Sequence, residues 1–154
     1  DRYYPELGAN WQTIPHTVLI DRLIREGKLS VKRDATQKIT FHDPCYLGRH
    51  NDIMDEPRSV VAALGELVEM PRNRKDSFCC GAGGGNYWSR EAGTARISDV
   101  RVAEALDTGA DKIATSCSFC LLMLGSSSAK HTEQRKVFDL AEIVVESLQD
   151  GTGT

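Results

Sequence analysis

Short apolar segments alternate with longer amphipathic ones along the chain, and their order predicts strands separated by helices. In the segment Lys38–His42, Ile39 and Phe41 occupy alternate positions between polar neighbours, which is the period of a half-buried strand. Three more strands are expected, at Leu67–Met70, Lys112–Ser116 and Val137–Phe138. Because helical segments separate these strands, the pattern predicts an α/β fold with a small parallel, Rossmann-like sheet flanked by helices.

Residues that commonly begin or end helices mark the helical segments. Pro15 suits a first helical turn, and Gly65 suits the end of a helix. Asp55 is expected to cap the second helix, and Asp139 followed by Glu142 has the spacing of a capping box. The helices are therefore expected at 15–26, Glu56–Leu64, Ser89–Asp107 and Cys117–Leu124, with a last one through Leu148.

The composition is that of a folded domain. The chain has 154 residues and a mass of 17.0 kDa, with 40% apolar and 27% charged residues, which is enough apolar material for one core. The net charge of −3 argues against a non-specific nucleic-acid binder, and no apolar run approaches the roughly 18 residues of a membrane span. Since the chain does not start with Met, it is expected to be a module or fragment of a longer protein. An N-terminal arm and helix are expected over residues 1–35, followed by a cysteine-rich domain over residues 36–150.

Five cysteines supply the strongest chemical signal. An odd number cannot pair completely within the chain, and two adjacent cysteines bridge only with strain, so we expect thiols kept for chemistry in a reducing compartment. The cysteines follow three of the predicted strands, whose carboxyl ends meet at one edge of a parallel sheet. All five cysteines are therefore expected to converge at this edge. They are Cys45, Cys79, Cys80, Cys117 and Cys120.

Converging thiolates select zinc, copper(I) or an iron–sulfur cluster. Zinc and a four-iron cubane each take four protein ligands, so a fifth cysteine indicates either a spectator thiol or a cluster of unusual shape. Three alternatives remain open at this point. The chain could carry five unrelated buried thiols, a structural zinc site that supports an interaction surface, or a metal-free thiol–disulfide site at Cys117 and Cys120.

A glycine-rich loop follows the adjacent cysteines. Gly81, Gly83, Gly84 and Gly85 would let backbone amides approach a bound anion or the sulfides of a cluster. The loop lacks the Lys-Ser/Thr ending of a Walker loop and the spacing of a dinucleotide fingerprint, which argues against nucleotide binding.

Charged and aromatic residues close to the cysteines are further candidates. His42 and Asp43 could relay protons or donate hydrogen bonds near a metal, although a strand end and a local turn are the favoured interpretation. The basic residues Arg49, Arg72, Arg74 and Lys75 could offset the charge of a thiolate site, dock an acidic partner or simply be solvated. Aromatic residues that adjoin cysteines are expected to form an apolar sleeve, namely Tyr46, Phe78 and Phe119.

Three segments together resemble the cysteine-rich CCG domain, which occurs in heterodisulfide reductases and in related iron–sulfur oxidoreductases. The segments are Phe41–Arg49, Ser77–Gly85 and Cys117–Cys120, and the resemblance extends over about residues 14–149. It is nearest to the C-terminal domain of reductases that pass electrons from electron-transfer flavoprotein to quinone. This chain departs from the family pattern in two ways. It has one copy of a motif that usually occurs twice, and it has Ser118 at a position where the family commonly has Pro.

The resemblance implies that all five cysteines bind a 4Fe-4S cluster, which is noncubane in heterodisulfide reductase, with zinc instead in some relatives. It implies that the chain is an electron-transfer module that works beside other domains or subunits of a larger oxidoreductase. That oxidoreductase would either pass electrons from electron-transfer flavoprotein to quinone or reduce a disulfide. The resemblance also implies a cytoplasmic location, where the parent protein would hold the module at the cytoplasmic face of the membrane. The alternative is a structural zinc-binding interaction domain.

Overall fold

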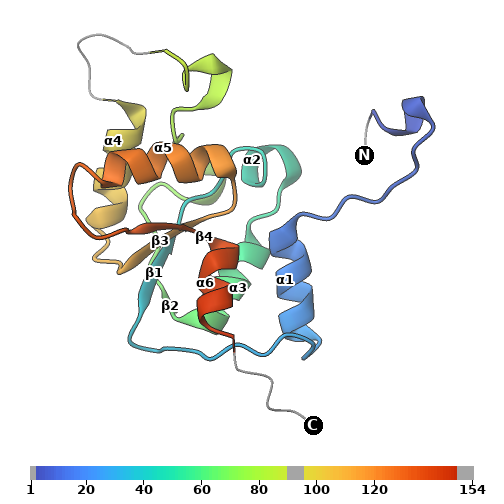
Figure 1. The fold of residues 1–154 in the computed structure, drawn as a ribbon, viewed down its shortest axis with the longest axis horizontal. Helices are drawn as coiled ribbons and strands as arrows, with labels where there is room; N and C mark the ends of the chain where they lie inside the picture. The colour runs from blue at the N-terminus through green and yellow to red at the C-terminus, as the bar shows by residue number, and fades with distance from the viewer. Residues whose placement is uncertain (1–2, 90–95, 149–154) are drawn as a thin grey trace.

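A computed structural model describes residues 3–89 and 96–148 as a four-stranded parallel sheet with helices on both faces (Figure 1). The strands are β1 (Lys38–Phe41), β2 (Glu66–Leu67), β3 (Lys112–Thr115) and β4 (Val137–Asp139). They lie in the order β2-β1-β3-β4, and every pairing is parallel. The α/β fold class predicted from the sequence is therefore confirmed.

Six α-helices connect or cover the strands in the described part of the chain. They are α1 (His16–Arg25), α2 (Gly48–Asn51), α3 (Asp55–Leu64), α4 (Ile97–Leu106), α5 (Ser118–Ser128) and α6 (Leu140–Glu146). Three short 3-10 turns lie outside them, at Pro5–Leu7, Arg74–Asp76 and Gly83–Gly85. None of the helices in the described segments is long and apolar enough to cross a membrane.

The sheet buries a different apolar cluster on each face. Ile39 and Phe41 of β1 pack with residues of α3 and α6, and α1 covers this layer from outside. Ile113 of β3 points to the other face, where Val102 of α4 and Leu124 of α5 cover it. The alternation of side chains along each strand thus produces three layers, with the sheet in the middle.

Several element ends match the sequence-based expectations, and others do not. Gly65 ends α3, and Asp139 begins α6 with a complete capping box. Asp55 is not a cap: it is the first residue of α3, and its carboxylate pairs with Arg74 at 2.6 Å. Ser89 does not begin a helix, because α4 starts at Ile97, while part of the expected helix, 90–95, lies outside the described residues.

The strand order creates a crevice at the carboxyl ends of β1 and β3. The chain leaves β1 through α3 towards β2 on one side of the sheet, and it leaves β3 through α5 towards β4 on the other. Neighbouring strands whose connections diverge in this way leave an open site beyond their carboxyl ends. The segments that follow β1 and β3 carry Cys45 and Cys117.

Candidate metal centre

The five predicted cysteines gather in this crevice. Cys45, Cys79, Cys80 and Cys120 line a single pocket, and Cys117 hydrogen-bonds the side chain of Cys120. All five are free thiols. Cys80 and Cys120 are buried, whereas Cys45 is exposed. The structure therefore brings together the residues that the sequence predicted to converge.

Helix α5 positions two of the sulfurs. Cys117 is its N-cap residue with an extended backbone, and Cys120 lies one turn further on. The pKa of Cys117 is lowered to about 6 because its sulfur accepts a hydrogen bond from Cys120, and backbone N–H groups of Cys120 and Phe119 add to the effect against the cost of burial. The start of a helix is a favourable place for an anionic thiolate.

The thiol of Cys80 has a pKa well below its ordinary value. A hydrogen bond from Cys120 is the main reason that the pKa of Cys80 falls to about 4, and hydrogen bonds from His42 and the Ala82 backbone also lower it although burial opposes them. The pKa of Cys120 is raised in return, since Cys120 donates to Cys117 and Cys80. The lowered pKa values of Cys80 and Cys117 favour the thiolate, which is the form in which cysteine binds a metal.

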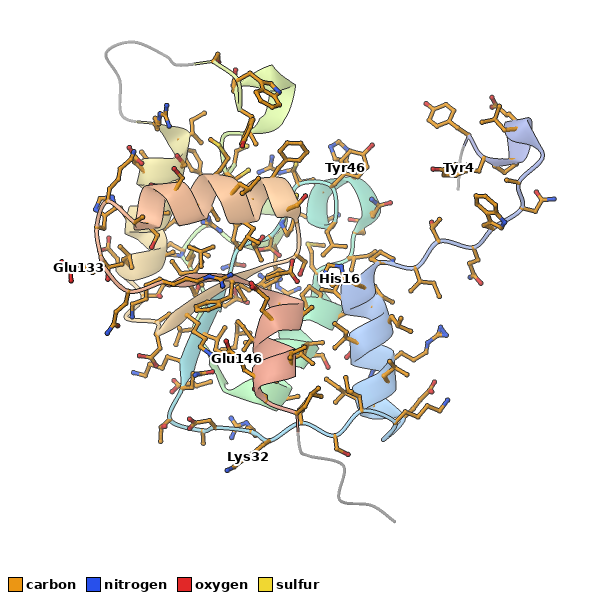
Figure 2. The ribbon with its side chains drawn as sticks, viewed as in Figure 1. Tyr4, His16, Lys32, Tyr46, Glu133 and Glu146 are labelled. Atoms are coloured by element: carbon orange, nitrogen blue, oxygen red, sulfur yellow. The ribbon has the colours of Figure 1, made fainter. Side chains whose placement is uncertain are left out.

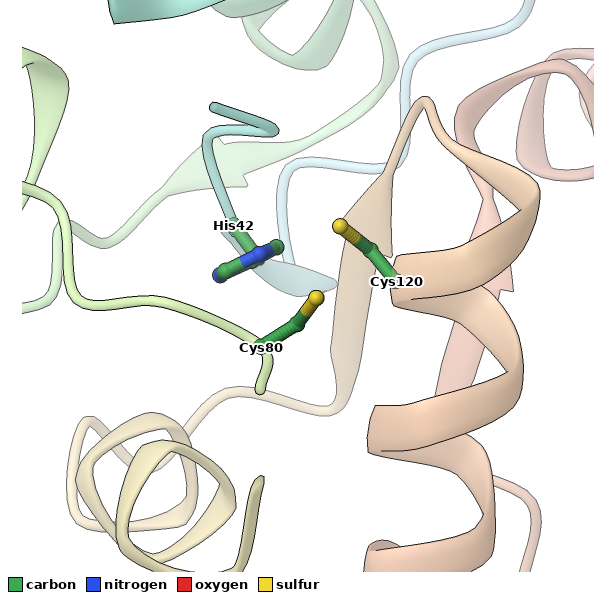
Figure 3. Close-up of side chains that lie close together, drawn as sticks. All are labelled: His42, Cys80 and Cys120. Atoms are coloured by element: carbon green, nitrogen blue, oxygen red, sulfur yellow. The ribbon is translucent and has the colours of Figure 1, made fainter. Parts of the chain in front are cut away.

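His42 lies beside these sulfurs. It follows β1 directly and is only 1% exposed, and its ring nitrogen and the sulfurs of Cys80 and Cys120 all lie within 4.8 Å of one another. Figure 3 shows both sulfurs on the same side of the imidazole. Burial lowers the pKa of His42, which keeps the ring neutral.

Asp43, the next residue, forms long-range contacts. Its carboxylate accepts hydrogen bonds from the Arg58 guanidinium at 2.7 and 3.0 Å and from the Arg74 backbone N–H at 2.8 Å. The favoured interpretation of Asp43 as a local turn residue is therefore wrong. Asp43 joins the segment before Cys45 to α3 and to the segment before Cys79.

The glycine-rich loop contacts the cysteines at its first residue. The Gly81 N–H donates to the sulfur of Cys79 at 3.2 Å, and Gly81 has a φ of 89°. Gly83, Gly84 and Gly85 form an exposed 3-10 turn, and a Cβ at any of them would meet nothing within 4 Å. The structure thus places Gly81 beside the sulfurs and the other three glycines in open space.

The rim of the pocket is basic and partly aromatic. Arg49 and Arg74 line the pocket, and Arg49 donates to the backbone carbonyls of Lys75 and Ser77. Of the three residues expected to form an apolar sleeve, Phe78 lines the pocket. Tyr46 is 75% exposed beside α2 (Figure 2) and Phe119 is 51% exposed, so the sleeve is incomplete.

The remaining predicted candidates lie in ion pairs or away from the cysteines. Arg72 pairs with Glu104 at 3.0 Å and Lys75 with Asp52 at 2.8 Å. Their side chains are therefore engaged at the surface.

Two buried arginines of the site were missed from the sequence. Arg58 of α3 holds Asp43, and Arg101 of α4 donates from Nε to Nδ1 of His42 at 3.0 Å. Arg101 lies three residues after Ser98 and four before Ala105, on the buried face of its helix. A charged residue at helical spacing from small, uncharged residues is the signal that could have found it.

Comparisons with known proteins agree with this chemistry. The family model of the cysteine-rich domain CCG matches residues 39–125. The chain is 38% identical to the EtfAB:quinone oxidoreductase of Syntrophomonas wolfei, over 95% of this chain and 22% of that protein. It is 40% identical to FadF of Bacillus subtilis, named a probable iron-sulfur-binding oxidoreductase, over 94% of this chain and 21% of that protein.

A more distant relative comes from an archaeon. The chain is 33% identical to one component of the dihydromethanophenazine:CoB–CoM heterodisulfide reductase of Methanosarcina barkeri, over 90% of this chain and 34% of that component. This chain thus spans between a fifth and about a third of the length of these relatives.

Proposed function

Because the chain belongs to the family of cysteine-rich CCG domains, we propose that its five cysteines hold an iron–sulfur cluster in an electron-transfer module of a larger oxidoreductase. One observation carries this proposal: four of the cysteines line one pocket, and the fifth is hydrogen-bonded to one of the four. Cysteines scattered through a core would have no reason to meet at the open end of a parallel sheet.

The donor set fits such a cluster. Soft thiolates are the ligands that iron–sulfur clusters take, and Cys80 and Cys117 already have pKa values of about 4 and 6. The N–H of Gly81 at the sulfur of Cys79 is the kind of donor that tunes a cluster. A bound cluster would supply one-electron chemistry. Since five sulfurs exceed the four of a cubane, we propose a 4Fe-4S cluster with noncubane geometry.

The names of the relatives support a reaction for the parent protein. One is an EtfAB:quinone oxidoreductase and another is part of a heterodisulfide reductase. We propose that the parent protein passes electrons from a reduced flavoprotein towards quinone, with disulfide reduction as the second reaction. The domain, residues 36–150, would work beside other parts of that protein, on the cytoplasmic side of a membrane.

A zinc site is the second candidate, and one observation favours it. The mutual distances within 4.8 Å among His42, Cys80 and Cys120 are those of residues that can share one ion, and zinc takes mixed His and Cys ligands. Such a site would be colourless and structural. It would use only part of the cysteine set.

Single cysteine variants separate the two candidates. Cys45→Ser and Cys80→Ser are each reconstituted anaerobically with iron and sulfide. Phe78→Leu serves as the control, because Phe78 lines the same pocket but its side chain has no atom that binds a metal. We expect both cysteine variants to lose iron or to change the electron paramagnetic resonance (EPR) spectrum, and the control to retain both. Full iron content with an unchanged spectrum in Cys80→Ser would contradict the assignment of Cys80 as a ligand.

A further inference from the structure

The guanidinium of Arg101 determines which nitrogen of His42 carries its proton. Arg101 donates from Nε to Nδ1 of His42 at 3.0 Å. A guanidinium has only donors and stays protonated in proteins, so the nitrogen that it contacts must be an acceptor. Nδ1 of His42 therefore has no proton, and the neutral ring carries its single proton on Nε2.

Nε2, the protonated nitrogen of His42, is the ring nitrogen that is available to the cysteine sulfurs. A ring nitrogen of His42 and the Cys80 sulfur lie within 4.8 Å of each other, and Nδ1 is already occupied by Arg101. A hydrogen bond to Cys80 must therefore use Nε2–H as donor and the sulfur as acceptor, which agrees with the direction in which each group shifts the pKa of the other. The sulfurs of Cys80 and Cys120 lie together on one side of the ring (Figure 3).

We infer that Arg101 is a positioning residue that holds His42 as the Nε2–H tautomer, so that His42 donates a hydrogen bond to the Cys80 sulfur and is not a metal ligand. The hydrogen-bond relay runs from Arg101 through His42 to Cys80. Its consequence for a cluster rests on the proposed function, whereas the tautomer itself does not.

Other contacts prevent Arg101 from turning away. Its side chain is completely buried. Nη1 donates to the Arg72 carbonyl at 2.8 Å and to the Glu104 carboxylate at 2.9 Å, and Nη2 donates to the Ser77 hydroxyl at 3.3 Å. With its other nitrogens held on several sides, the guanidinium can present Nε only to His42. A guanidinium fixed in this way is a rigid fork rather than a mobile charge.

The relay has two consequences for a metal bound at this site. A neutral imidazole binds a metal through an unprotonated nitrogen, so a ring whose Nδ1 is engaged and whose Nε2 is protonated leaves only sulfur ligands. A hydrogen bond to a ligand sulfur also withdraws charge from it, which favours the reduced, more negative state of a cluster and raises its reduction potential.

Nuclear magnetic resonance of the metal-free 154-residue chain tests the tautomer directly. Long-range ¹⁵N–¹H spectra distinguish the two neutral forms of histidine by the pattern of their ring couplings. We expect the His42 pattern of a protonated Nε2 and a bare Nδ1. A protonated Nδ1, or a ring protonated on both nitrogens, would overturn the inference.

Matched variants test the role of Arg101. In Arg101→Met the tautomer population of His42 should shift towards a mixture, whereas Arg72→Met should leave it unchanged because Arg72 shares the Glu104 partner without its side chain touching His42. Equal populations in Arg101→Met and the unmodified chain would overturn the role of Arg101. Should Arg101→Met fail to fold, Arg101→Lys keeps the buried charge and one donor group for the same comparison.

The potential of the reconstituted cluster provides a second readout. His42→Phe keeps a ring of similar size and removes the donor, so the midpoint potential should move in the negative direction relative to the Arg72→Met control. An unchanged potential would show that His42 does not donate to a ligand sulfur. If the chain takes up no iron, the proposed function fails while the spectra of the metal-free protein still decide the relay.

Discussion

Asp43, which lines the cysteine pocket, forms a buried, two-pronged ion pair with Arg58. Nη1 and Nη2 of Arg58 contact the two carboxylate oxygens of Asp43 at 2.7 and 3.0 Å, and both side chains are almost completely buried. Arg58 also contacts Glu69 at 2.5 Å. Although burial opposes it, these hydrogen bonds raise the pKa of Arg58, so the guanidinium keeps its charge throughout the accessible pH range.

Removing Arg58 should therefore be costly. Arg58→Met leaves the Asp43 carboxylate buried without its main partner, and breaking a buried pair in this way costs about 3–5 kcal/mol of the free energy of unfolding. Urea unfolding of the metal-free chain measures it. Lys75→Met is the control, since Lys75 and Asp52 form an exposed pair that should contribute nothing measurable. Equal unfolding midpoints for the two variants would contradict the role assigned to Arg58.

Replacing either of two glycines in the same loop by alanine should change the free energy of unfolding by different amounts. Gly81 has a φ of 89°, and a Cβ there would lie 3.1 Å from the Cβ of Ile97. Gly81→Ala should thus lower the free energy of unfolding by at least the roughly 1–2 kcal/mol of a left-handed residue. Gly83→Ala meets no atom within 4 Å and should be neutral. Thermal unfolding compares them, and an equal loss in both would show that the loop does not hold this conformation in solution.

The sequence was most informative where local chemistry decides the structure. The alternation of Ile39 and Phe41 located β1, and the capping box of Asp139 and Glu142 located α6. Both patterns depend on residues that lie close together in the chain. The start of α4 at Ile97 escaped prediction because its N-cap, Arg96, makes no side-chain capping bond.

The site shows the same division between local and long-range information. The cysteines were predictable because their chemistry is visible in the residue type and their convergence follows from the parallel sheet. The arginines that contact His42 and Asp43 were not predictable. Arg101 is 59 residues from His42 in the sequence, and Arg58 is 15 residues from Asp43. Only tertiary packing reveals that charged residues of two helices support the sulfur-bearing segments.

The ion pair between His16 and Asp139 gives the stability a pH dependence. The two side chains lie 3.3 Å apart, and this hydrogen bond raises the pKa of His16 against the effect of burial. A raised pKa means that the contribution of His16 is complete below the unfolded value of about 6.5 and is lost as the pH rises through the folded value. Because His16 is half exposed, solvent limits this contribution to below about 1 kcal/mol.

Urea unfolding at about pH 5.5 and about pH 8 measures this contribution. The unmodified chain should lose more stability than His16→Gln between the two values. Although burial opposes them, hydrogen bonds from His16 and the Ala141 N–H lower the pKa of Asp139, so its carboxylate stays ionised over this range. Parallel pH profiles for the two proteins would exclude the pair as a source of the dependence.

The central claim is that the five gathered cysteines hold an iron–sulfur cluster. The most direct test is to reconstitute the chain anaerobically and measure iron, sulfide and zinc per chain together with the EPR spectrum. A 4Fe-4S cluster predicts about four irons and four sulfides per chain and a signal that is lost or altered when Cys80 is replaced by Ser. One zinc per chain with no uptake of iron would contradict the claim and would make the domain a structural zinc site.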